Sequence, residues 1–203
     1  VAEGLSELVS IPGLQFSLHF NLTHETRYRS PLRLAFATMV GRLKPSYLRK
    51  EFLRQLQVLR GHGIHPEFLD GHHHCHVFPG VLPALLPLLR DAGIRQVRLP
   101  MDTSSWAPAR LLISYFAHRS SRALLSSGFK TQLFYYPSPS VLRNPRRFQQ
   151  ELSKRPPSEV LVHPASRDDF EEFKISDPYR AGRVKEFRAL ANLGESQTRS
   201  SRN

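Results

Sequence analysis

Cysteine is almost missing from this sequence. Its 203 residues include only Cys75, so no intramolecular disulfide can form. A chain without disulfides is typical of a reducing compartment, so we expect a cytoplasmic protein. Long apolar runs are missing as well. The longest, from Val77 to Leu89, is interrupted by prolines and too short for a bilayer, so we expect no transmembrane segment. No stretch resembles a signal peptide.

Acidic residues are scarce: 17 aspartates and glutamates stand against 29 lysines and arginines, and the net charge is +12. Such a charge could steer an anionic substrate or attract nucleic acid weakly. The basic residues are scattered over expected helices, without interleaved aromatics or a nucleic-acid motif. We therefore expect a solvated basic surface and no nucleic-acid partner, and a basic RNA- or DNA-associated module is the weakest functional hypothesis.

Histidine, in contrast, is concentrated in the run from Asp70 to His76, which follows the strand-like Phe68-Leu69. If the strand continues through the run, alternation places Asp70, His72, His74 and His76 on one face. A carboxylate and imidazoles in a row can bind a divalent metal or perform acid–base chemistry. The alternative is a surface tract that binds metals adventitiously. Cys75 would point away from His72, which favours a packing role over a ligand role.

Apolar periodicity predicts alternating strands and helices along the chain. Leu14 to Thr23 alternates strictly, with His19 on its polar face near the end. The connection 24–45 is long, as connections that contact substrate often are. Further strands are predicted at about 68–70, 96–99, 130–136 and 159–163, and helices at 46–61, 80–93 (kinked or broken at Pro87), 107–127, 144–153 and 177–193. This order predicts an α/β fold with a parallel sheet, one domain over 1–193, and a disordered tail at 194–203.

Histidines fall at the carboxyl ends of three of these strands: His19, the cluster that begins at His72, and His163. In α/β barrels the carboxyl ends of the strands carry the chemistry. The sequence therefore predicts a functional site at this edge of the sheet.

The same residues resemble the YdjC-like carbohydrate deacetylases, a family that includes chitooligosaccharide deacetylases and hopanoid-biosynthesis-associated members. Ser17–Thr23 resembles the family's Gly-Leu-His-Leu-Asn-Leu-Thr strand, and Leu69–His76 resembles its Leu-Asp-Ser-His-Gln-His-Val-His run. Supporting matches are Glu51 with Gln55, the strand 92–100, the strand 159–164 and Arg183 with Glu186. The resemblance covers most of residues 14–190.

The resemblance implies a (β/α) barrel of the glycoside hydrolase/deacetylase type that removes N-acetyl groups from an amino sugar or glycolipid. His19 and His72 would be ligands of a divalent metal. The resemblance favours magnesium, whereas histidine ligands also allow zinc. Asp70 would hold a histidine by a second-shell hydrogen bond. The resemblance also implies that Arg98 and His76 contact the substrate. It implies that His163 and His74 are the catalytic residues, with one of them donating a proton to the leaving amine.

The sequence departs from the family pattern before His19, where the family carries Asp-Asp-Phe-Gly with a metal-binding carboxylate and the catalytic base. The similar letters at Asp168–Glu171 are interpreted as coincidence. We expect an N-terminally truncated, incomplete barrel that is inactive as the chain stands. A non-catalytic metal- or sugar-binding relic is the alternative, and coding sequence upstream of Val1 would separate the two. Unpaired strand edges leave homo-oligomerisation open.

Overall fold

The computed structural model describes residues 9–23, 28, 30–100, 108–135, 144–153, 159–160, 162, 164–166 and 180–200. The chain forms two compact units, Val1–Leu133 (unit 1) and Phe134–Asn203 (unit 2). Within the described ranges no helix is long and apolar enough to cross a membrane.

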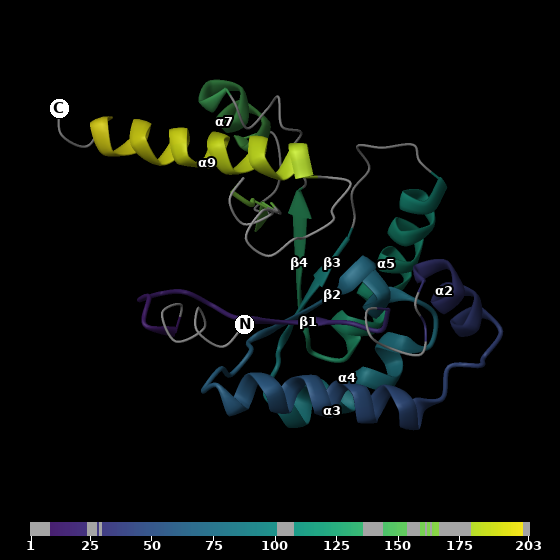
Figure 1. Ribbon diagram of the computed structural model, residues 1–203. Helices are drawn as coiled ribbons and strands as arrows, with labels where there is room; N and C mark the ends of the chain where they lie inside the picture. The colour runs from purple at the N-terminus through teal and green to yellow at the C-terminus, as the bar shows by residue number, and fades with distance from the viewer. Residues whose placement is uncertain are drawn as a thin grey trace. The chain divides into compact units, whose positions relative to one another are not determined.

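Unit 1 is built on parallel strands that pair in the order β1-β2-β3-β4. The predicted α/β fold with a parallel sheet is therefore confirmed, and closure of the sheet into a barrel remains a prediction. Figure 1 shows α3 and α4 running side by side below the strands. The elements are β1 (Ser17–Phe20), α2 (Pro31–Met39), α3 (Pro45–Gly61), β2 (Phe68–Gly71), the 3-10 segment η1 (His72–Val77), α4 (Val81–Ala92), β3 (Gln96–Leu99), α5 (Pro108–Ser126) and β4 (Lys130–Tyr135).

Unit 2 contains the end of β4, where Phe134 and Tyr135 pair in parallel with β5 (Glu159–Val160). Its helices are α7 (Pro145–Ser153) and α9 (Arg180–Ser200). The last helix thus continues past Leu193, and residues 194–200 are helical where the sequence predicts a disordered tail. Glu195, Gln197 and Arg199 favour helix, and a polar composition by itself does not end one.

The core of unit 1 lies between the sheet and its helices. Leu18, Phe20 and Leu22 of the alternating segment are buried, and His19 is on the exposed side, as predicted. The helices predicted at 46–61 and 80–93 form as α3 and α4, and each buries an apolar stripe. Their buried members are Leu48, Phe52, Leu56, Val81, Leu82, Leu85, Leu88 and Leu89. Gly93 adopts φ 82° and ends α4, whereas Pro87 lies inside the continuous helix and does not break it.

The segment 24–45, predicted as a connection, contains helix α2. Ser30 has the extended backbone of an N-cap residue and Pro31 occupies the first turn, where proline is favoured because its missing N–H has no intrahelical partner. Leu34, Ala37 and Thr38 are buried on one side of this helix.

The predicted alternation across the histidine run is wrong, because β2 ends at Gly71 and the chain turns into η1. His73 and His74 have φ values of 50° and 57°, in the left-handed region that non-glycine residues rarely adopt. The turn brings His76 back against Gly71. A strand-like period of two therefore does not describe which side chains of the run share a face.

We expect Gly71→Ala to destabilise unit 1, because an added Cβ would lie 2.5 Å from Nδ1 of His76 and 3.0 Å from its backbone nitrogen. Overpacking of this kind lowers the free energy of unfolding by about 1–3 kcal/mol, which urea titration measures. The matched control is Gly61→Ala at the end of α3, where the added Cβ meets nothing within 4 Å. Its change should stay within about 0.5 kcal/mol. Equal unfolding midpoints for the two variants would contradict the close approach of Gly71 and His76.

Candidate functional site

The site begins with the register of β1 and β2, which places His19 opposite Asp70 and Phe20 opposite Gly71. His19 Nδ1 lies 2.9 Å from Asp70 Oδ1. Because a carboxylate accepts this hydrogen bond, Nδ1 carries the proton and Nε2 of His19 keeps a lone pair. The carboxylate thereby fixes both the tautomer and the ring orientation of an exposed histidine.

His72 follows β2 directly, and its Nδ1 lies 3.4 Å from Nε2 of His19. The two rings meet edge to face, with centroids 5.5 Å apart. Two nitrogens that ligate one ion at about 2.1 Å each are separated by roughly 3.0–3.4 Å, depending on the coordination geometry. The pair therefore fits two adjacent ligand positions of one ion. Within the described ranges, no group of three histidine, cysteine or carboxylate side chains comes together as a metal site.

Arg98 on β3 holds Asp70 from the side away from His19. Its guanidinium lies 3.5 Å from Asp70 Oδ2, donates to the Ser17 hydroxyl at 3.2 Å, and sits over the Phe68 ring. Burial by itself raises the pKa of Asp70, but the hydrogen bond from His19 and the charge of Arg98 outweigh burial and hold the pKa below its ordinary value. Asp70 is thus a carboxylate at neutral pH.

His76 lies behind the site. It is fully buried, and its Nε2–H donates to the backbone carbonyl of Arg98 at 2.7 Å. In the described part of the chain its Nδ1 has no hydrogen-bond partner. Burial lowers the pKa of His76 to about 4, so its ring is neutral. Substrate contact by His76 stays a prediction, and its position favours a supporting role that ties η1 to β3.

The other residues of the run differ in exposure. Burial lowers the pKa of the half-buried His74 to about 4, and His73 is exposed with its ring 4.1 Å from that of His72. Cys75 is buried with Sγ 3.3 Å from the carbonyl of Phe20, which confirms its packing role. Burial raises the pKa of the Cys75 thiol to about 12. The proton-donating role of His74 stays a prediction, and His163 lies outside the described residues.

A set of side-chain hydrogen bonds from α3 to the chain just after β1 was not predicted from the residue pattern itself. Gln55 of α3 pairs with both backbone groups of Asn21: the Asn21 N–H donates to its Oε1 at 2.9 Å, and its Nε2 donates to the Asn21 carbonyl at 2.6 Å. Gln55 also donates to Glu51, which Arg54 holds at 2.6 Å. The one local signal in the sequence is the spacing of Asn21 and Thr23. The side chain of Asn21 accepts the Thr23 N–H, as in an Asx-turn, which marks the end of the strand where Gln55 binds.

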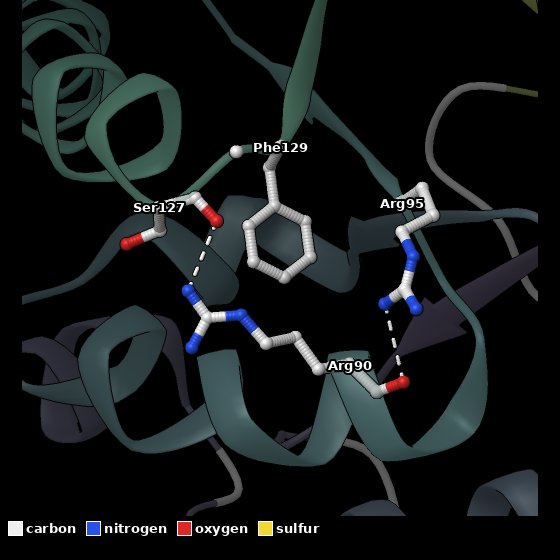
Figure 2. Close-up of a pocket in the computed structure, with 5 residues that line it drawn as sticks. Arg90, Arg95, Ser127 and Phe129 are labelled. Carbon is white, nitrogen blue, oxygen red and sulfur yellow. Dashed lines mark hydrogen bonds between the residues drawn. The ribbon is translucent and has the colours of Figure 1, made fainter.

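Unit 1 has another hollow at the opposite, amino ends of β3 and β4 (Figure 2). Arg90 donates to the carbonyl of Ser127 at the end of α5 and lies over the Phe129 ring, and Arg95 donates to the carbonyl of Arg90 at the end of α4. Both guanidinium groups therefore cap helix C-termini, where cations are stabilising. This arrangement supports the fold, and the paired histidines remain the candidate site.

Comparisons with known proteins bear on the family and on the fold. A family model described as YdjC-like protein matches residues 2–194. Over 80 residues the chain is 31% identical to a protein of Xenopus laevis named "Carbohydrate deacetylase", an alignment that covers 37% of this chain and only 26% of that relative's length. A crystal structure from Enterococcus faecalis, described as a "putative cellobiose-phosphate cleavage protein", superposes with a TM-score of 0.60 at 16% identity, over 96% of this chain and 77% of that one. This last likeness concerns the fold alone.

The buried His76 should make stability depend on pH. Its pKa is 6.5 ordinarily and about 4 in the folded chain, so between these values the unfolded chain binds more protons. The stabilisation is therefore complete above pH 6.5 and is lost as the pH falls toward 4, by about 3 kcal/mol for this shift. His76→Gln keeps a donor for the Arg98 carbonyl and removes the titration, so urea unfolding across this pH range should show a shallower decline than in the wild type.

The control for this experiment is Leu56→Ala, which removes buried apolar volume in α3 without touching a titrating group. It should lower the free energy of unfolding by about 2–5 kcal/mol at every pH and keep the wild-type slope. A His76→Gln profile parallel to the wild type would show that His76 does not titrate on unfolding.

Proposed function

The chain belongs to the YdjC-like family, and from that premise we propose that it is a metal-dependent hydrolase that removes N-acetyl groups from an amino-sugar-containing substrate. The observation that carries the proposal is the approach of His19 Nε2 to His72 Nδ1, 3.4 Å apart at the carboxyl ends of neighbouring parallel strands. The printed name of the Xenopus laevis relative supports the reaction class. Because the alignment spans about a quarter of that relative, activity and substrate are proposals for this chain.

In this proposal His19 and His72 hold a divalent ion, magnesium by family resemblance or zinc by the preference of imidazole for softer metals. When bound, such an ion polarises the acetyl carbonyl and lowers the pKa of a water molecule. At least one further ligand is needed, since the described residues supply only this pair of converging nitrogens. By accepting the hydrogen bond from the Nδ1–H of His19, Asp70 would orient the Nε2 of that ring as a ligand for the ion.

The remaining residues bind and orient. Arg98 is a partly buried cation beside Asp70, at the edge where the histidines lie, and we assign it contact with polar oxygens of the sugar or of the acetyl group. A histidine would donate a proton to the leaving nitrogen as the C–N bond breaks, a role that the family resemblance gives to His163 or His74. Because burial lowers the pKa of His74 to about 4, its ring is neutral at pH 7, and His163 is the favoured donor. His76 fixes the backbone of Arg98 and so preserves the distance between Arg98 and Asp70.

The proposal extends to the architecture. The strands are all parallel and neighbour one another in chain order. A doubly wound sheet would reverse its strand order at a switch point, whereas a (β/α) barrel adds each strand beside the previous one. Sequential order therefore favours the barrel that the sequence predicts.

We expect His19→Ala and His72→Ala each to abolish specific binding of Mg²⁺ or Zn²⁺, measured by isothermal titration calorimetry, because each removes one of two converging nitrogens. Asp70→Asn should weaken binding by about 10- to 100-fold, since it alters the hydrogen bond that orients His19. The control is His62→Ala, an exposed histidine at the end of α3. Wild-type affinity in both alanine variants would refute the assigned ligands.

The reaction is tested on the natural gene product by acetate release from N-acetylglucosamine oligomers. We expect metal-dependent release that His72→Ala eliminates and His62→Ala preserves. If the protein binds metal through His19 and His72 yet releases no acetate from N-acetylated sugars, hydrolysis is wrong and the alternative of a non-catalytic metal- or sugar-binding protein takes its place.

A further inference from the structure

Helix α2 carries an apolar stripe that faces solvent. Leu32, Phe36, Met39 and its C-cap residue Val40 are 77%, 61%, 62% and 47% exposed. At about 100° per residue these four positions fall on one side of the helix, opposite the buried Leu34, Ala37 and Thr38. The helix is therefore apolar on two sides, and only one of them is used by the core. We call the four exposed residues the α2 stripe.

The surroundings of the α2 stripe are basic. The sequence from Tyr28 to Lys50 contains no aspartate or glutamate, and its cations are Arg29, Arg33, Arg42, Lys44, Arg49 and Lys50. Arg33 borders the stripe on the helix itself, and Arg42 and Lys44 follow the turn after it; all three are exposed. Exposed apolar side chains flanked by cations match a partner that is both apolar and anionic.

We propose that the α2 stripe docks on an anionic lipid surface, with its apolar side chains at the boundary between headgroups and acyl chains and the flanking cations on lipid phosphates. Side chains that are 47–77% exposed protrude from the helix, whereas side chains that line a protein-binding groove are covered by its walls. A fluid bilayer accepts protruding side chains without a matching pocket.

A second copy of the chain suits this surface less well. A symmetric contact through the α2 stripe would bring the same cations of both copies together, since a two-fold interface uses one patch twice. The segment offers no acidic residue to pair with them. Charge complementarity therefore favours an anionic partner over self-association.

Helix α2 packs against η1, the segment that begins with His72, and the α2 stripe lies on the side of the helix opposite its buried residues. The docking proposal does not rest on the hydrolase proposal, since its observations are exposure and charge on α2 and its test measures lipid binding without turnover.

The test is flotation of the full chain with vesicles of phosphatidylcholine alone or mixed with phosphatidylserine. We expect flotation with the mixed vesicles that weakens as salt is raised, and little with phosphatidylcholine alone. The double variant Leu32→Glu/Phe36→Glu should bind mixed vesicles at least about tenfold more weakly, because it places carboxylates in the apolar boundary. Arg42→Ser/Lys44→Ser should lower affinity by about fivefold per cation and reduce the dependence on phosphatidylserine.

The matched control is Leu53→Glu, a similar charge introduced at an exposed leucine of α3, which should float like the wild type. Equal thermal midpoints for the variants show that any loss is not a loss of folding. The proposal is overturned if the wild type fails to float at low salt, or if the α2 variants float as well as Leu53→Glu does. It is also overturned if ultracentrifugation shows a lipid-free dimer that Phe36→Glu dissociates, which would assign the α2 stripe to a second copy.

Discussion

The hydrogen bond between His19 and Asp70 is the interaction on which the candidate site depends. It exists because β1 and β2 pair in parallel with these residues in register, so a slip of either strand by one residue would turn its own member of the pair to the opposite face of the sheet. Its direction places Nδ1 of His19 against Asp70 and leaves Nε2 of the same ring facing His72. That hydrogen bond and the charge of Arg98 together hold the pKa of Asp70 below its ordinary value. The site is thus a property of three neighbouring strands, and no single motif contains it.

The sequence predicted the elements that rest on simple periodicity. The alternation around His19 and the helices predicted at 46–61 and 80–93 reappear in the structure, because each follows from a local rule of burial or backbone geometry. The convergence of His19 with the histidine run was predictable for the same reason. Parallel strands bring their carboxyl ends to one edge, whatever the length of chain between them.

The sequence could not predict the path of the histidine run. Alternation requires the strand to continue beyond Gly71, but the chain turns there through two left-handed histidines, a conformation that no side-chain pattern signals. What permits the turn is the bare Cα of Gly71 against the His76 ring, a contact between residues whose proximity is known only once the turn is made. Helix α2 was missed for a different reason, since its long exposed side chains disguise an amphipathic pattern, although Ser30 and Pro31 mark its start.

Cys75 gives the molecule an internal reporter. It is the only thiol in the chain, and it is closed off beneath the site with a pKa of about 12, so neither access nor ionisation favours attack by an alkylating reagent. Exposure of that sulfur requires η1 to leave Phe20, which is the same opening that would separate His72 from His19. Slow alkylation under native conditions would therefore report how often η1 opens beside the histidine pair, without a label engineered into the protein.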